Sequence, residues 1–217
     1  GGSGLHAGRS ASKACDAAAA ALLAGAASVC LVAALAGHSD GRAVSGSVQR
    51  MLLHVCCGPC AAGCVDRFPP GWSPVLFYSN SNIATIDEYR LRLEQVRILA
   101  SARGLPLVEE AYDHAAWRAA VAGLEAEPEG GARCARCFRF SLARAAARAA
   151  ATGCARYTTT LTVSPRKRSA DVIDAGRATS GAAGFWELDF KKGGGFARGV
   201  AVSRSLGLYR QTFCGCE

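Results

Sequence analysis

The sequence contains a single methionine, Met51, among 217 residues, and the next nine positions read LLHVCCGPC. The segment before it is rich in alanine, and residues 17–37 carry no charged side chain. That run is long enough to cross a bilayer, but Ala and Gly insert poorly, so we expect no membrane association. Residues 1–50 are expected to be a disordered extension, either an upstream-start artefact or a transit peptide. Residues 51–217 are expected to form the functional domain.

Acidic residues are scarce relative to basic ones. The chain has 17 Asp and Glu against 25 Lys and Arg, a net charge of +8. An excess of positive charge suits a polyanionic partner such as nucleic acid. Arg-rich domains of high-GC genomes share this balance, so charge by itself leaves the partner open.

The sequence lacks a Gly/Ser-rich loop after its first predicted strand, where it reads CCGPC. ATP-using tRNA thiolation and ligation enzymes need such a loop to hold the pyrophosphate. This class of enzyme is therefore disfavoured. No internal repeat is visible either.

Short apolar runs alternate with segments of helical composition after Met51. This alternation predicts an α/β fold, with a parallel sheet flanked by helices on both faces. Strands are expected at 51–57, 73–80, 105–113, 154–165 and 184–190, and helices at 60–68, 85–104, 114–125 and 138–153, with a further helix before the last strand. Residues 126–137 and the basic KKGGG at 191–195 are expected to be loops.

The clearest helix is residues 85–104. Thr85 is a suitable N-cap, Glu88 completes a capping box and Gly104 ends the helix. The apolar residues that share one face of this helix are Tyr89, Leu93, Val96 and Leu99 or Ala100.

Polar and sulfur-bearing residues follow several predicted strands. Ligands of parallel α/β sheets bind at the carboxyl ends of the strands, so these residues are expected to surround one site. They are Cys56, Cys57 and Cys60 after the first strand, Asn80 and Asn82 after the second, and 160–165 at the end of a later one.

Seven of the eleven cysteines fall into three groups, which are Cys56, Cys57 and Cys60, then Cys134 and Cys137, then Cys214 and Cys216. Disulfide scaffolds are short and loop-rich, whereas this chain is long enough to bury a core. We therefore interpret the groups as reduced thiolates that bind metal. A structural zinc site and a thioredoxin-like exchange pair are the alternatives.

A tetrahedral zinc site or an iron–sulfur cluster takes four ligands, so seven thiols exceed the need of one site. Four for a cubane cluster and three for a neighbouring metal would use all seven. The turn at Gly58 and Pro59 is expected to hold Cys60 apart from Cys56 and Cys57, so that this stretch serves two metals.

Five separated motifs read LLHVCCGPC, RCARCF, TTTLTVSPRK, DFKKGGGFARG and LYRQTFCGC. In order and spacing they resemble the cobalamin-independent epoxyqueuosine reductases, the QueH family, over residues 51–217. The resemblance implies a Rossmann-like, HUP-type fold with a [4Fe–4S] cluster beside a second metal, expected to be iron. It also implies reduction of the epoxide of epoxyqueuosine to queuosine at the wobble position of tRNA. An external donor such as ferredoxin or flavodoxin would supply the electrons, in the cytoplasm or in an organelle if a transit peptide is present.

The resemblance also suggests roles for the thiols. We expect Cys134 and Cys137, with one or two of Cys57, Cys214 and Cys216, to hold the cluster. Cys56 and Cys60, with the remainder, would hold the second metal and act in catalysis. Some relatives carry Asp at the position of Cys60, which suits a harder metal. Glu127 and Glu129 precede the CxxC, and Glu129 is the expected proton donor.

The motifs shared with the family also imply roles for residues other than the cysteines. Ribose or phosphate contacts are expected from Thr158, Thr159, Thr160, Thr162, Ser164 and Lys167, although the threonines also suit an ordinary strand. Contacts to the tRNA backbone are expected from Asp189, Lys191, Lys192 and Arg198, with plain surface charge as the alternative. The base or the surroundings of the cluster are expected to involve Tyr209, Arg210 and Gln211.

His54 lies within the first strand and is expected to be a hydrogen-bonded core residue. The chain also departs from the family pattern at three places, which are Ser141 in place of an Arg, Ser81 in place of a Pro, and Gly199 in place of a Ser. These departures concern tRNA contacts more than the reaction.

Overall fold

The computed structural model describes residues 48–216. Most of the expected extension lies outside this range. Strand β1 (Gln49–Val55) begins two residues before Met51, because Gln49 and Arg50 pair with the start of β2 (Trp72–Tyr78). The expected boundary after residue 50 therefore falls inside a strand.

Five parallel strands form one sheet in the order β3-β2-β1-β4-β5. The remaining strands are β3 (Leu107–Glu109), β4 (Arg156–Thr159) and β5 (Gly184–Phe185). This finding confirms the predicted parallel α/β sheet. The order reverses direction between β1 and β4, the kind of switch point at which doubly wound sheets leave a crevice for ligands.

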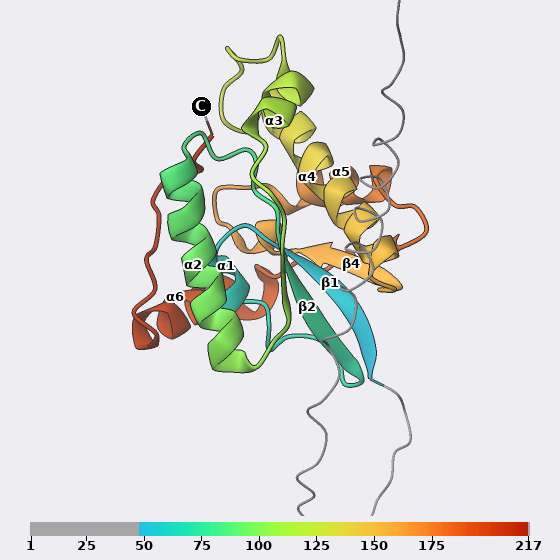
Figure 1. Cartoon of the computed structure of the whole chain (residues 1–217), viewed down its shortest axis with the longest axis vertical. Helices are drawn as coiled ribbons and strands as arrows, with labels where there is room; N and C mark the ends of the chain where they lie inside the picture. Colours follow the sequence, from blue (N-terminus) through green and yellow to red (C-terminus); the bar gives the residue numbers. More distant parts are fainter. Residues whose placement is uncertain (1–47, 217) are drawn as a thin grey trace, which may run out of the picture. The chain divides into compact units, whose positions relative to one another are not determined.

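Helices cover both faces of the sheet (Figure 1). They are α1 (Gly58–Ala62), α2 (Ile86–Arg103), α3 (His114–Val121), α4 (Ala132–Ala151), α5 (Ser169–Ala178) and α6 (Gly195–Ser205). Leu53 and Val55 of β1 pack in one apolar core with α1 and α2, whereas Leu52 packs in a second core with α4 and α5. Successive side chains of a strand point to opposite faces, so β1 contributes to both cores.

Helix α2 follows its sequence prediction closely. The Thr85 hydroxyl accepts a hydrogen bond from the Glu88 N–H at 3.3 Å, and Gly104 ends the helix in the left-handed conformation with φ 60°. The predicted apolar face is buried. The Glu88 carboxylate, however, forms an ion pair with Arg92 at 2.6 Å. Thr85 therefore caps the helix as expected, whereas the Glu88 side chain does not complete the capping box.

Several boundaries differ from expectation, among them those of α1, expected at 60–68, and of β3, expected at 105–113. Helix α4 begins at Ala132, so Cys134 and Cys137, which were predicted in a loop, lie in its first two turns. The Glu127 carboxylate accepts a hydrogen bond from the Ala132 N–H at 3.0 Å and so satisfies a donor that the helix itself leaves unpaired. The expected strand 154–165 becomes a 3₁₀ turn, Thr160–Val163, after Thr159. Strand β5 has two residues. The expected loop at 191–195 contains a 3₁₀ turn, Lys192–Gly194, and leads into α6, which was not predicted.

Gly58 gives a test of the packing between α1 and α2. A Cβ atom here would lie 2.6 Å from the Gln95 carbonyl oxygen, which is backbone and cannot swing away. We expect Gly58→Ala to lower the free energy of unfolding by about 1–3 kcal/mol, as overpacked sites do. Gly181→Ala is the matched control, since no atom lies within 4 Å of its Cβ position. Urea unfolding monitored by circular dichroism measures both, and equal stabilities would refute this packing.

Candidate functional site

The first thiol group lies directly after β1. Cys57 caps α1, and its sulfur accepts the Cys60 N–H at 3.4 Å, with a proline in the first turn. The three sulfurs of Cys56, Cys57 and Cys60 lie within 4.8 Å of one another. The expectation that Gly58 and Pro59 separate Cys60 from the other two is therefore wrong, because the capped turn of α1 brings its sulfur back toward them. These three thiols can share one metal ion.

Thr160 joins this triad to the other side of the crevice. The Cys56 N–H donates to the Thr160 hydroxyl at 3.1 Å, and that hydroxyl donates to the Cys56 sulfur, 3.3 Å away. Hydrogen bonds from the Cys57 and Cys60 thiols hold the pKa of Cys56 well below its usual value. The pKa of Cys57 is raised to about 12, first because it shares its proton with Cys56, and that of Cys60 is also raised. A metal bound by all three sulfurs would displace the protons of two thiols.

The second and third thiol groups lie around a cavity of about 240 Å³, whose lining includes Cys134, Cys137, Cys214 and Cys216. The Trp117 indole N–H donates to the Cys137 sulfur at 3.3 Å, and the Gly130 N–H donates to Cys134 at 3.2 Å. A hydrogen bond from Cys216 and the charge of Lys167 lower the pKa of Cys214 to about 5. The smaller cavity thus has four sulfurs, and donors already point at two of them.

A larger cavity of about 390 Å³ lies beside this smaller cavity, and its lining includes all three cysteines of the triad, Cys56, Cys57 and Cys60. Cys137, Cys214, Glu129 and Lys167 line both cavities. The seven thiols therefore surround two adjoining cavities at the carboxyl edge of the sheet. Asn80, Asn82, Ser164 and Pro165 also line the larger cavity, which confirms that the strand ends predicted to meet do so.

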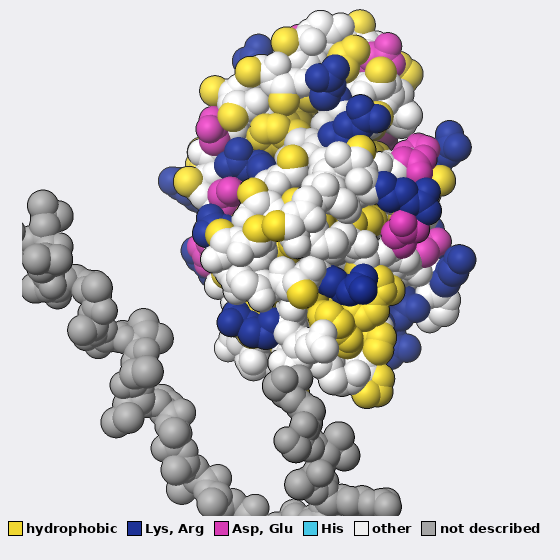
Figure 2. Space-filling model, turned by 90° about the vertical axis from the view of Figure 1, so that its right-hand side faces the viewer, with side chains coloured by type: hydrophobic (Ala, Val, Ile, Leu, Met, Phe, Trp, Pro, Cys, Tyr) yellow, Lys and Arg dark blue, Asp and Glu magenta, His cyan; other side chains and the backbone are white. Residues whose placement is uncertain are grey.

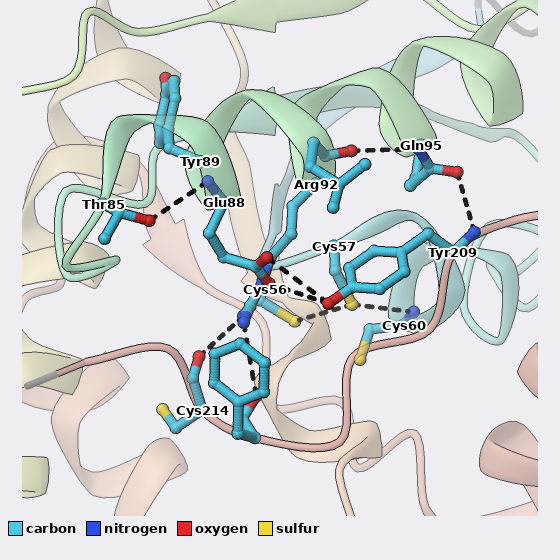
Figure 3. Close-up of polar contacts among 12 residues, drawn as sticks. Cys56, Cys57, Cys60, Thr85, Glu88, Tyr89, Arg92, Gln95, Tyr209 and Cys214 are labelled. Atoms are coloured by element: carbon cyan, nitrogen blue, oxygen red, sulfur yellow. Dashed lines mark hydrogen bonds and ion pairs between the residues drawn. The ribbon is translucent and has the colours of Figure 1, made fainter.

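Helix α2 holds the C-terminal segment in place (Figure 3). The Arg92 side chain is buried, is paired with Glu88 and donates to the Cys214 carbonyl at 2.7 Å. The Tyr209 N–H donates to the Gln95 side chain at 2.9 Å, and the Ala84 N–H donates to the Gly215 carbonyl at 2.8 Å. Sequence reasoning missed Arg92. Its spacing from Glu88, four residues along a helix, was the available signal.

The predicted substrate residues divide into two groups. Ser164, Lys167, Arg210 and Gln211 line the larger cavity. The lining of neither cavity includes Thr159, Thr160, Lys191, Lys192, Arg198 or Tyr209.

Lys167 lies next to the thiols. Its ammonium is 3.8 Å from the Cys214 sulfur, and its carbonyl accepts from the Lys191 ammonium. Burial acts to lower the pKa of Lys167, but nearby thiolates and Glu129 outweigh it and raise the pKa. The charge of Lys167 thus lies beside the clustered thiols.

His54 is a hydrogen-bonded core residue, as predicted. Its Nε2–H donates to the Ser79 carbonyl at 3.1 Å, and its Nδ1 lies 2.9 Å from the Thr159 hydroxyl. Burial lowers the pKa of His54, which keeps the ring neutral, so Nδ1 accepts from Thr159. Thr159 therefore supports the strand ends beneath the cavity.

Positive charge is distributed over the surface. On the face seen in Figure 2, Lys and Arg side chains are scattered, with Asp and Glu side chains among them except toward the lower end. The basic groups that line the two cavities are Arg92, Arg133, Arg166, Lys167, Arg168 and Arg210. Among the described residues, 48–216, no helix is both long and apolar enough to span a bilayer.

The fold and site together define a class of α/β proteins with clustered cysteines at the carboxyl edge of a parallel sheet. The sequence model of the family described as "Epoxyqueuosine reductase QueH" matches residues 51–217. The chain therefore belongs to the epoxyqueuosine reductase QueH family, a family of oxidoreductases.

Individual relatives agree. The epoxyqueuosine reductase QueH of Thermotoga maritima is 34% identical over 171 residues, covering 76% of this chain and 88% of the relative. That of Acinetobacter baylyi is 32% identical over 174 residues, covering 78% and 80%. That of Streptococcus pyogenes serotype M1 is 32% identical over 174 residues, covering 76% and 68%.

Proposed function

We propose that this protein reduces epoxyqueuosine to queuosine at the wobble position of tRNA, on a Rossmann-like, HUP-type scaffold. The observation that carries the proposal is the convergence of seven thiols on two adjoining cavities at the switch point of the sheet. Family membership supplies the substrate. A structural zinc site would need only four of these thiols.

The donor sets fit two metal groups. The four sulfurs around the smaller cavity match the Cys₄ ligation of a [4Fe–4S] cluster. The triad of Cys56, Cys57 and Cys60 matches a second metal, proposed to be iron. This division moves Cys57 to the second metal and places Cys214 and Cys216 with the cluster. When bound, the cluster would pass electrons singly, and the second metal would polarise the epoxide oxygen as a Lewis acid.

The reaction breaks both C–O bonds of the epoxide and forms a carbon–carbon double bond, so the oxygen leaves as water after taking up two electrons and two protons. A ferredoxin- or flavodoxin-type donor would supply the electrons. Glu129 and Lys167 line both cavities and would hold protons near the departing oxygen. Ser164 and Arg210 would bind the sugar–phosphate region at the wall of the cavity.

Charges outside the cavities would hold the rest of the tRNA. Lys192 and Arg198 are exposed on the segment that leads into and forms α6, and Lys191 is half-buried beside them. Arg67 fixes this segment, since its guanidinium donates to the Phe190 carbonyl at 2.6 Å and to the Lys192 carbonyl. These side chains would contribute to binding through the phosphates, which makes affinity fall with salt.

The direct test is conversion of epoxyqueuosine-tRNA to queuosine-tRNA by protein purified anaerobically and supplied with a strong reductant. We expect a brown protein with broad visible absorption and a product that lacks one oxygen by mass spectrometry of nucleosides. A colourless protein that contains stoichiometric zinc and gives no product would contradict the proposal.

Trp117 provides a test of the cluster site by a property other than activity. Its N–H donates to the Cys137 sulfur, and hydrogen bonds to sulfur stabilise the more negative, reduced cluster. We expect Trp117→Phe to shift the reduction potential to a more negative value with iron content unchanged, as measured by redox titration. Trp72→Phe is the control, because Trp72 contacts Trp186, with ring centres 5.0 Å apart, and lines neither cavity. Equal potentials in the two variants would refute the assignment.

A further inference from the structure

Two exposed phenylalanines stand out at the larger cavity. Phe196 of α6 is 46% exposed and Phe213 of the C-terminal segment is 50% exposed, and both line that cavity. The other exposed large apolar side chains in residues 48–216 line neither cavity, and they are Val48, Ile86, Leu91 and Ile98. The two rings are therefore set apart from ordinary surface apolar residues by their place in the wall.

Phe213 is held in position by Arg92 of α2. The Arg92 guanidinium lies 5.1 Å from the centre of its ring, and Arg92 also donates to the Phe213 carbonyl at 3.4 Å. Arg92 is itself paired with Glu88. A ring that rests on a fixed guanidinium keeps its orientation before any ligand arrives.

Tyr209, the aromatic residue expected to contact the base, is already committed elsewhere. Its hydroxyl lies 3.4 Å from both carboxylate oxygens of Glu88, and its backbone N–H donates to Gln95. In the segment 208–216, Phe213 is therefore the aromatic side chain available to a ligand in the cavity.

Gln211 indicates which end of a ligand would lie next to the triad of Cys56, Cys57 and Cys60. Its amide oxygen is the only buried side-chain oxygen or nitrogen without a hydrogen-bond partner in residues 48–216. Gln211 lines the larger cavity together with the three cysteines of the triad. A free acceptor beside the triad suits a hydroxyl or N–H donor of a ligand, because a buried oxygen left unpaired is costly.

The substrate of the proposed function has these two ends. Its hydroxylated, epoxide-bearing ring is polar and must reach the metal region, and it is joined through an aminomethyl link to a flat purine-like base. With the ring placed at Gln211, the two phenylalanine rings in the wall of the same cavity are left to contact the base.

We infer that Phe196 and Phe213 form a stacking site for the wobble base of the tRNA, while the Gln211 amide oxygen accepts a hydrogen bond from the substituent ring. This inference rests on the proposed function and adds to it the residues that hold the base outside the stack of the anticodon. Stacking on aromatic side chains is a common way for proteins to hold an unpaired RNA base.

The test is binding of an anticodon stem-loop RNA that carries epoxyqueuosine, measured by fluorescence anisotropy with the metal-loaded protein under anaerobic conditions. We expect Phe213→Leu and Phe196→Leu each to raise the Kd and the KM about 10-fold, as loss of one stacked base does, with little change in kcat. Phe213→Tyr should restore wild-type binding because it keeps the ring. Ile98→Ala, which alters an exposed apolar side chain outside both cavities, should leave the Kd unchanged.

Visible absorption and the thermal midpoint are recorded for every variant, so that loss of metal or fold is separated from loss of stacking. If the wild type converts the stem-loop and both Leu variants bind it within twofold of wild type, the stacking site is refuted while the proposed function stands. If the wild type neither binds nor converts the epoxyqueuosine stem-loop, the proposed function itself fails.

Discussion

Cys60→Ser is expected to lose about one iron atom per chain and to retain the visible absorption of the proposed cluster, while activity falls at least about 100-fold. The reason is that the thiols proposed to bind the second metal are different from the thiols proposed to bind the cluster. Cys60 belongs to the triad within 4.8 Å and lines only the larger cavity, whereas four other sulfurs surround the smaller one. Iron analysis, absorption spectra and turnover of epoxyqueuosine-tRNA measure the three effects.

Cys216→Ser should behave in the opposite way, since Cys216 lines only the smaller cavity. It is expected to lose most of the cluster iron and absorption together with activity. Cys64→Ser is the matched control. Its buried sulfur donates to the Cys60 carbonyl at 3.2 Å, a bond that a hydroxyl can replace, and it lines neither cavity. Should Cys60→Ser and Cys216→Ser lose the same iron and the same absorption, the two-site division is wrong.

Gly215→Ala is expected to abolish stable cluster binding although no thiol is changed. Gly215 has φ +100°, and a Cβ atom there would lie 2.7 Å from Arg92 Nη2. Arg92 cannot yield freely because it binds Glu88 and the Cys214 carbonyl. The segment that carries Cys214 and Cys216 must therefore move, in addition to about 1–3 kcal/mol of backbone strain.

Gly207→Ala separates these two causes. Gly207 also has a positive φ, +64°, but no atom lies within 4 Å of its Cβ position. It is expected to lower the thermal midpoint while iron per chain stays at the wild-type level. Anaerobic reconstitution followed by iron analysis compares the pair, and equal iron contents would show that Arg92 does not hold the C-terminal segment as proposed.

Much of the fold was predictable because its signals are local. The cap at Thr85, the glycine at 104 and the apolar spacing between them lie within one helix, and the structure confirms each. The parallel sheet followed from the alternation of elements. The start of α4 was missed because its cap comes from Glu127, five residues before Ala132, across glycines that suggest a loop.

The candidate site was predictable in its components and less so in its arrangement. Spacing identified the seven thiols, and the rule for strand ends placed the first group at the edge of the sheet. The same reasoning separated Cys60 from its neighbours, whereas the Cys57 cap of α1 brings their sulfurs together. Tyr209 and Phe213 are both aromatic in sequence, and only contacts with α2 show that the first is engaged and the second faces the cavity.

The sequence by itself determined the fold class, the thiol inventory and the resemblance to the QueH family, since these depend on residue types and on short spacings along the chain. The tertiary structure decided which thiols share a cavity, and it identified Arg92, Trp117 and Phe213 as their neighbours. The physical reason is that these contacts join segments far apart in the chain, and their geometry is set by how α2, α4 and the C-terminal segment pack around the sheet.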